Sequence, residues 1–339
     1  ENGAYHLGSN EVAWQAFVLM NQAMLMQRVN SGKMQGREVS PTLVKWFPFQ
    51  LAYIVQIIPD IVDEKSDWRD TVDLLWYPTG GGKTEAYLGL AAFTIFFRRL
   101  TLGEVGDGVT ILMRYTLRLL TAQQFERATA LICACEYLRQ EFKLPGGEIS
   151  IGLWVGSSVT PNSIENTKEA LEKLRAGKPV RQGNPFQVFK CPFCGKDLDL
   201  GCYKVENDSL KIRCNNEQCY FCNGLPIYVV DDDIYLKRPS LVLSTVDKFA
   251  RIVWQERTTA IFGSDGKTYP PDLVIQDELH LISGPLGSLT GLYESAVDEL
   301  CTKNRRRPKV IASTATARNS VRQIKALYNR DSFQFPPSG

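Results

Sequence analysis

The segment PTGGGKT, residues 78–84, contains the residue types that bind the phosphate groups of a nucleotide. Its glycines allow successive backbone N–H groups to point at phosphate oxygens. Lys83 is expected to reach the β- and γ-phosphates, and the Thr84 hydroxyl to bind Mg²⁺. Tyr77 replaces the usual first glycine, but the loop follows an expected strand and opens an expected helix, so we interpret it as an ATP site rather than a glycine-rich turn. The expected nucleotide contacts are Thr79, Gly80, Gly81, Gly82, Lys83 and Thr84.

A pair of acidic residues lies in the segment LVIQDELH, residues 273–280. Asp277 ends an expected strand, where its carboxylate can hold the hydrated Mg²⁺ ion. Glu278, the next residue, can orient and deprotonate the attacking water molecule. Together with Lys83 of the phosphate loop, this pair predicts a catalytic centre for ATP hydrolysis.

Two further segments are expected to couple the nucleotide site to the rest of the protein. A lone histidine is usually structural, but for His280, in the arrangement Asp-Glu-x-His, we favour a coupling role. The segment ASTATA, residues 312–317, follows another expected strand. The hydroxyls of Thr314 and Thr316 could hydrogen-bond the acidic loop and report the state of the γ-phosphate.

Six of the nine cysteines lie between Cys191 and Cys222, a crowding that favours a metal site in a reducing cytoplasm over disulfides. The segment CPFCG pairs Cys191 with Cys194 in a knuckle, and four thiolates satisfy tetrahedral Zn²⁺. The second pair comes from RCNNEQCYFC, which offers Cys214, Cys219 and Cys222. Spacing alone favours the last two. A zinc site here could bind DNA or a partner, but we favour a structural staple for a small insertion without its own core.

These residues must be positioned by a sheet, and short, continuous apolar runs predict its strands. Such runs are typical of buried parallel strands, and helix-length segments at 83–100 and 116–143 separate them. This alternation predicts an α/β domain with three layers. Residues 1–70 are interpreted as a helical lead-in, and 160–235 as an insertion. The strands are expected at residues 72–76, 109–115, 149–155, 240–245, 272–277 and 308–314.

The composition is that of an ordinary globular protein of 339 residues, with 44% hydrophobic and 22% charged residues. The net charge of +2 does not indicate a nucleic-acid binder, so any basic surface must be local. No apolar run reaches the roughly 18 residues that a membrane helix needs, and nothing resembles a signal peptide. We therefore expect a cytoplasmic protein without membrane contact. The missing initiator Met suggests a trimmed or partial chain.

The motifs PTGGGKT, DELH and STAT, in this order, resemble those of superfamily 2 helicases. The resemblance implies that the chain is the first RecA-like domain of such an enzyme, a P-loop ATPase domain. This domain would comprise residues 71–159 and 236–339, interrupted by the insertion with a zinc ribbon at about 188–226. It also implies that a second RecA-like domain, outside this chain, supplies arginines to the transferred phosphate.

Further segments resemble helicase motifs that contact nucleic acid or adenine. RYTLRLLTAQQ, residues 114–124, resembles motif Ia, which implies that Arg114 and Arg118 contact the DNA backbone. LSTVDKFA, residues 243–250, resembles motif Ic, which implies the same of Thr245 and Lys248. The glutamine of FPFQ, Gln50, resembles the residue that reads adenine in the Q motif; the alternative is an ordinary surface amide.

Longer strings, such as QDELHLISGPLGSLTGLYE, resemble the helicase-like subunits of the DISARM anti-phage defence system. This resemblance implies a DNA-engaging ATPase that uses ATP and Mg²⁺ and acts with a partner subunit in bacterial defence. It also favours Cys214 with Cys219, so that Cys191, Cys194, Cys214 and Cys219 would hold zinc. The alternatives are a DNA translocase without unwinding and a nucleotide-switched, DNA-binding scaffold that recruits a partner.

Overall fold

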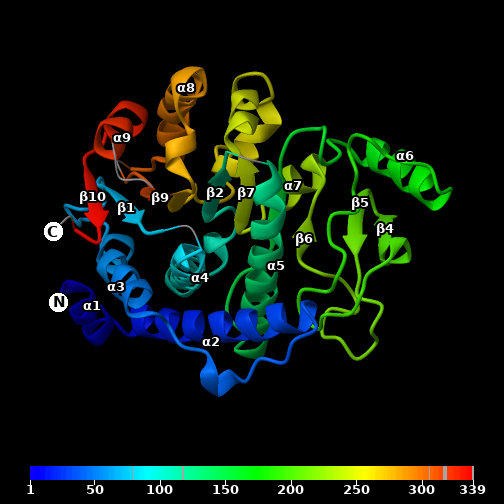
Figure 1. The fold of residues 1–339 in the computed structure, drawn as a ribbon, viewed down its shortest axis with the longest axis horizontal. Coiled ribbons are helices and arrows are strands. Elements are labelled where there is room, and N and C mark those ends of the chain that lie inside the picture. Colours follow the sequence, from blue (N-terminus) through cyan, green and yellow to red (C-terminus); the bar gives the residue numbers. More distant parts are fainter. Residues whose placement is uncertain (79, 117, 305, 316–318, 338–339) are drawn as a thin grey trace.

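The computed structural model describes residues 1–78, 80–116, 118–304, 306–315 and 319–337. Figure 1 shows a central sheet with helices on both sides. The α-helices are α1 (Asn2–Ser9), α2 (Glu11–Met34), α3 (Pro48–Val62), α4 (Lys83–Leu102), α5 (Arg118–Glu141), α6 (Ile164–Arg175), α7 (Asp231–Lys237), α8 (Gly284–Cys301) and α9 (Ser320–Tyr328). The strands of the main sheet are β1 (Val72–Trp76), β2 (Ile111–Tyr115), β3 (Ile151–Trp154), β6 (Ile227–Tyr228), β7 (Leu241–Thr245), β8 (Leu273–Gln276), β9 (Lys309–Thr314) and β10 (Ser332–Phe335).

The strands of this sheet follow the order β10-β1-β9-β8-β2-β7-β3-β6, and all neighbouring strands are parallel. The strand that precedes the phosphate loop, β1, thus lies beside β9, and β9 lies beside β8, which precedes the acidic pair. This arrangement is a RecA-like P-loop fold, which confirms the predicted fold class. The six expected strands are present, while β6 and β10 were not expected.

Helices cover both faces of the sheet. Alternate residues of each strand point to opposite faces, so each strand contributes side chains to two cores. Leu75, Met113 and Leu243 belong to a core with α2, α3, α4 and α5. Leu74 and Leu112 belong to a second core with α7, α8 and α9. Continuous apolar strands are therefore required here, as they are in other parallel sheets that helices cover on both sides.

The N-terminal helices are part of the first core. Helix α2 begins after Asn10, whose side chain caps it by accepting a hydrogen bond from the N–H of Ala13 at 3.0 Å. It packs against α4 and α5, and α3 packs against α4 and α1. Figure 1 shows α2 below α4 and crossing the lower part of α5. None of the described helices is long and apolar enough to span a membrane.

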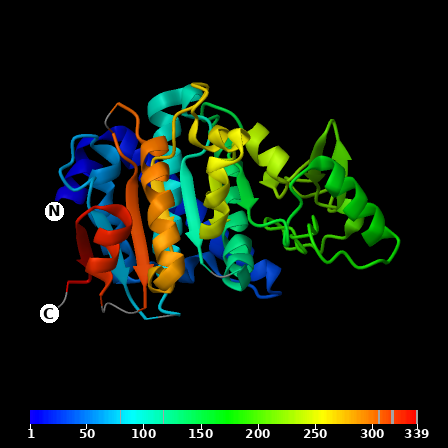
Figure 2. The same cartoon turned by 90° about the horizontal axis from the view of Figure 1, so that it is seen from above.

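The cysteine-rich region and α6 project from one end of the sheet, as Figure 2 shows. A small antiparallel hairpin of β4 (Tyr203–Glu206) and β5 (Ser209–Ile212) lies within it. The chain returns to the main sheet at β6, which pairs with β3, and continues into α7. The last residues of the expected insertion, 227–235, therefore lie on the main sheet.

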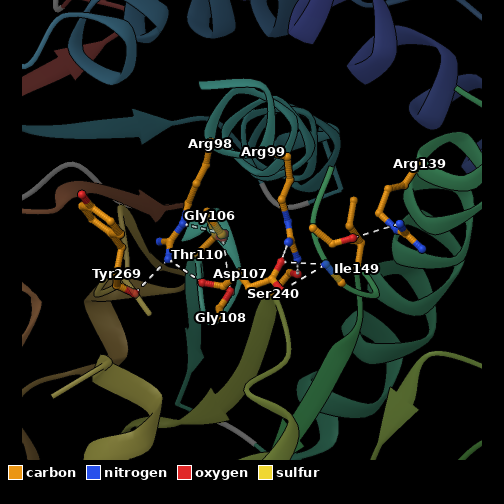
Figure 3. Close-up of polar contacts among 12 residues, drawn as sticks. Arg98, Arg99, Gly106, Asp107, Gly108, Thr110, Arg139, Ile149, Ser240 and Tyr269 are labelled. Atoms are coloured by element: carbon orange, nitrogen blue, oxygen red, sulfur yellow. Dashed lines mark hydrogen bonds and ion pairs between the residues drawn. The ribbon is translucent and has the colours of Figure 1, made fainter. Parts of the chain in front are cut away.

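Two buried arginines near the end of α4 fix the loops at the amino-terminal edge of the sheet (Figure 3). The Arg98 guanidinium forms an ion pair with Asp272 at 3.0 Å. It also donates hydrogen bonds to five loop carbonyls, those of Gly106, Asp107, Val109, Tyr269 and Pro270. Arg99 pairs with Asp107 in the same loop. These contacts tie the starts of β2 and β8 to α4, the helix that begins at the phosphate loop.

Candidate functional site

The phosphate loop lies at the opposite, carboxyl-terminal edge of the sheet. Gly80 and Gly82 have φ angles of 78° and 87°, a left-handed conformation that other residues rarely adopt. Gly82 is the N-cap of α4, so the loop leads directly into a helix N-terminus with free backbone donors for an anion. The Lys83 Nζ donates to the carbonyl oxygen of Tyr77 at 2.7 Å, which holds the lysine across its own loop.

The acidic pair lies close to this loop because β1, β9 and β8 are neighbours. The Asp277 carboxylate accepts a hydrogen bond from the Tyr87 hydroxyl at 2.7 Å, and the Tyr87 oxygen lies 3.0 Å from the Thr84 hydroxyl. Ser313 at the end of β9 donates to the same carboxylate. The structure thus brings together the two residues, Thr84 and Asp277, that were expected to bind Mg²⁺. Their oxygen donors are those that this ion prefers.

Glu278 follows Asp277 in a strained backbone conformation, with a φ of 50°. Burial raises the pKa of its carboxyl group, and the negative charge of Asp277 raises the pKa further. The nearby charges of Lys83 and His280 act in the opposite direction. The result is a half-buried carboxyl group with a raised pKa beside the phosphate loop, a property that suits a general base near neutral pH.

His280 connects the acidic pair to the end of β9. Its Nδ1 lies 3.4 Å from the Glu278 carboxylate and 3.1 Å from the Thr314 hydroxyl. One imidazole therefore contacts both segments that were expected to communicate. Thr316, the other expected coupling residue, lies outside the described residues, as does Thr79 of the phosphate loop.

Gln50 lies beside the phosphate loop, but its side-chain amide is used within the protein. The amide oxygen accepts a hydrogen bond from the N–H of Phe47 at 2.8 Å, and the amide nitrogen donates to the carbonyl of Gly82 at 2.8 Å. Gln50 is 3% exposed, so it is not an ordinary surface amide. In this conformation it links the start of α3 to the phosphate loop.

A cavity of about 1290 Å³ opens over the phosphate loop and the acidic pair. Its other walls come from α2, the segment 38–47 and α5. Arg127 of α5 lines this cavity, and its guanidinium lies 3.5 Å from the Glu85 carboxylate. Arg127 lies only three residues after the segment 114–124 that resembles motif Ia, yet the structure places it on the nucleotide side. Its position in α5 alone could not reveal this, because the cavity depends on tertiary packing.

Three of the four expected DNA-contacting residues lie inside the protein, which does not fit that role in this conformation. Arg114 is 1% exposed and forms an ion pair with Glu294 at 2.5 Å. Lys248 is 2% exposed, and its Nζ contacts Asp231 at 2.7 Å. Thr245 is also buried.

The burial of these side chains has a simple cause. Arg114 lies within β2 and Thr245 at the end of β7, neighbouring strands that helices cover on both sides. Both side chains therefore occupy core positions in this structure. Lys248 lies in the short 3₁₀ segment Val246–Val253, which packs against the sheet. The fourth residue, Arg118, begins α5, and its side chain is not among those described.

Four cysteines come together in the projecting region. The Sγ atoms of Cys191, Cys194, Cys214 and Cys219 all lie within 4.8 Å of one another. Two of the distances, Cys191–Cys219 and Cys194–Cys214, are 3.8 and 3.5 Å. A tetrahedral Zn²⁺ with Zn–S bonds of about 2.3 Å separates its sulfurs by roughly 3.8 Å, so the cluster has the dimensions of a zinc site. Cys222, the alternative ligand, is not part of it.

All nine cysteines are described, and all are free thiols rather than disulfides. The cysteine cluster is held against two helices that also wall the large cavity. Lys190 donates to the carbonyl of Met34 at the end of α2 at 2.8 Å. Tyr220 donates to Gln140 near the end of α5 at 2.7 Å. The geometry fits a staple that joins the projecting region to α2 and α5.

Comparisons with known proteins show what the chain as a whole is similar to. No family model matches the chain. The chain is 41% identical, over 387 aligned positions, to a DISARM protein DrmA from Bacillus paralicheniformis, which confirms the resemblance drawn from the motifs. The match covers 97% of the chain and 35% of that relative, so the chain spans about a third of the relative's length.

Similar solved structures include several helicases. The DUF1998 helicase MrfA bound to DNA matches with a TM-score of 0.49 and 12% identity, over 91% of this chain and 29% of that one. The Mycobacterium smegmatis helicase Lhr, bound to single-stranded DNA and AMP-PNP, matches with a TM-score of 0.46 and 15% identity, over 87% of this chain and 28% of that one.

Proposed function

From its 41% identity to part of the DISARM protein DrmA, we propose that this chain is the ATP-binding, RecA-like part of a helicase-type motor that acts on DNA in bacterial anti-phage defence. The observation that carries this proposal is the meeting of three segments at one sheet edge. The phosphate loop provides Lys83 and Thr84, the acidic loop provides Asp277 and Glu278, and His280 contacts both the acidic loop and Thr314. Together these segments can bind ATP, hydrolyse it and report the result.

Each residue has a distinct role in this proposal. Lys83 leaves the Tyr77 carbonyl and turns to the β- and γ-phosphates, while the loop amides and the α4 N-terminus bind phosphate oxygens. Thr84 and Asp277 would hold Mg²⁺, which would neutralise charge on the phosphates. The Glu278 carboxylate accepts a proton from the attacking water molecule.

Coupling to DNA is proposed to run through His280. The His280 ring contacts both Glu278 and Thr314. When Glu278 gains a proton, or shifts on loss of the γ-phosphate, its contact with His280 changes. His280 can pass this change to Thr314 at the end of β9. DNA binding is expected to be independent of base sequence, because we expect the protein to contact mainly the phosphates, which are the same at every position. Arg118 remains the proposed backbone contact, and Arg114 and Lys248 are left out because they are buried.

The cysteine cluster is proposed to bind one Zn²⁺ as four thiolates. Its contacts with Met34 and Gln140 favour a structural role over DNA binding. A partner subunit from the same defence system and a location in the cytoplasm complete the proposal.

ATPase rates of this chain together with the second RecA-like domain that the resemblance implies, measured with single-stranded, duplex and forked DNA and without DNA, test this function. We expect the rate to rise with at least one DNA form and to be lost in Glu278→Gln. Strand displacement would identify a helicase, and stimulation without displacement a translocase. ATP binding with a slow rate that no DNA form changes would instead support the switch-like scaffold and contradict the motor.

A further inference from the structure

Tyr87, one turn into α4, links the two residues that are proposed to hold Mg²⁺. It is 2% exposed, and its hydroxyl lies between Thr84 on its own helix and Asp277 after β8. A tyrosine at a buried position of an apolar helix is usually a packing residue, so the sequence analysis did not identify Tyr87 as a site residue. Packing alone, however, accounts for the ring and not for the hydroxyl group.

The directions of the hydrogen bonds follow from counting protons. The Tyr87 hydroxyl has one proton, which it donates to Asp277 Oδ2 at 2.7 Å. A phenol, with an ordinary pKa of about 10, keeps this proton at neutral pH. At the 3.0 Å contact with Thr84, the threonine hydroxyl must therefore be the donor. The proton of Thr84 points at Tyr87, which leaves the lone pairs of its oxygen available to a cation.

The other oxygen of Asp277 is fixed as well. Its Oδ1 accepts hydrogen bonds from the Ser313 hydroxyl and from the N–H of Glu278, the latter at 2.9 Å. The Asp277 carboxylate is thus held by Tyr87 of α4, by Ser313 of β9 and by the N–H of the next residue. Among the hydrogen bonds of the described residues, the one from Tyr87 is the link between this carboxylate and Thr84 of the phosphate-loop helix. Outer partners of this kind orient metal ligands and tune metal affinity.

We infer that Tyr87 is a positioning residue, whose hydroxyl holds Thr84 and Asp277 in the relative placement that lets one divalent cation bind between them. The inference rests on the proposed ATP site and names how its metal is held. Tyr87→Phe keeps the ring but removes both hydrogen bonds. Because loss of an outer partner costs about 10-fold or more in metal affinity, we expect the Mg²⁺ concentration for half-maximal binding of a fluorescent ATP analogue to rise about 10-fold.

Binding of the analogue in EDTA should be unchanged by Tyr87→Phe, because the cation site is not used there. Tyr53→Phe is the matched control: this buried tyrosine donates to the carbonyl of Asp73 at 3.1 Å, away from the phosphate loop. It should lower thermal stability about as much as Tyr87→Phe without moving the Mg²⁺ midpoint. An equal shift in both variants would show a general loss of structure and overturn the inference.

A double variant provides an independent measurement. Asp277→Ala removes a proposed ligand together with the acceptor of Tyr87, and should raise the Mg²⁺ midpoint. Adding Tyr87→Phe should then raise the midpoint less than it does in the wild type, because one of the two hydrogen bonds of Tyr87 is already lost. Additive shifts would overturn the inference. Failure of the wild-type chain to bind the analogue at any Mg²⁺ concentration would instead refute the proposed ATP site itself. An unchanged midpoint in Tyr87→Phe, with normal wild-type binding, would refute only the role of Tyr87.

Discussion

At the scale of single residues, Glu278 combines an unusual backbone conformation with a raised pKa. A raised carboxyl pKa means that the proton is released only at higher pH, so the base is active above that pKa and inactive below it. We therefore expect the acidic limb of the ATPase pH profile to lie at higher pH than the ordinary glutamate pKa of about 4.3. Phosphate release measured across pH tests this expectation; a rate that stays flat down to the ordinary value would contradict it.

Substitution of the same residue separates binding from chemistry. Glu278→Gln keeps the size and polarity of the side chain but cannot accept the proton of water. We expect hydrolysis to fall by roughly 10²-fold or more, while affinity for a fluorescent ATP analogue stays close to wild type. Hydrolysis at the wild-type rate would remove Glu278 from the proposed mechanism.

Gln50 allows the sequence-based and structure-based interpretations to be compared directly. If the amide reads adenine, Gln50→Ala should weaken ATP binding and leave GTP binding unchanged. The structure instead uses this amide to join Phe47 to Gly82, so we expect equal weakening for both nucleotides through a loosened phosphate loop. Competition titrations with ATP and GTP measure the difference. A loss confined to ATP would support base reading.

At the scale of structural elements, α4 connects the two edges of the sheet. It begins at Gly82 in the phosphate loop, and near its other end Arg98 satisfies five carbonyls and Asp272. Removing one partner of a buried ion pair typically costs 3–5 kcal/mol. Asp272 would keep its second pair, with Arg306 at 2.9 Å, but the five loop carbonyls would lose their donor. We expect Arg98→Ala to lower the free energy of unfolding by about that amount in denaturant titrations.

A matched control for that variant is Arg257→Ala. The Arg257 side chain is 59% exposed and pairs with Asp232 at the surface. Such pairs contribute at most about 1 kcal/mol, so its removal should change stability little. Similar losses in the two variants would mean that the loop contacts of Arg98 are not what stabilises this edge.

The cysteine cluster is an element of its own, held to α2 and α5 by side-chain contacts. We expect elemental analysis to find about one zinc per chain, because the four thiolates fill one tetrahedral site. Cys191→Ser should expose the projecting region to protease while the sheet remains folded. Cys222→Ser, outside the cluster, should keep its zinc. Loss of zinc in Cys222→Ser would show that the proposed set of four ligands is wrong.

At the scale of the whole molecule, the sequence predicted the sheet because buried parallel strands need continuous apolar runs. β10 was missed because SFQF is not a continuous apolar run, and β6 because its two residues lie in the stretch interpreted as an insertion. The phosphate loop, the acidic pair and the Cys191–Cys194 knuckle were recognisable because local spacing encodes their geometry. For the second cysteine pair, spacing favoured Cys219 with Cys222, and only the family resemblance favoured the clustered Cys214 with Cys219.

Long-range features were harder to predict. Arg114 and Lys248 lie in helicase-like motifs, yet their ion partners Glu294 and Asp231 are distant in the sequence. The hydrogen bond from Tyr87 to Asp277 spans two elements in the same way. Whether a polar side chain faces a ligand or a buried partner depends on these contacts, which residue type and spacing do not reveal.

The central claim, a Mg²⁺–ATP site at the carboxyl edge of the sheet, is tested most directly by equilibrium binding of a fluorescent ATP analogue to the wild-type chain and to Lys83→Ala. Lys83 contacts only the Tyr77 carbonyl among the described residues and is free to turn to phosphates. We predict Mg²⁺-dependent binding by the wild type and a loss of at least about 10-fold in affinity in the variant, since a charged hydrogen bond contributes about 1.5–3 kcal/mol. Equal affinity of the two proteins would contradict the account.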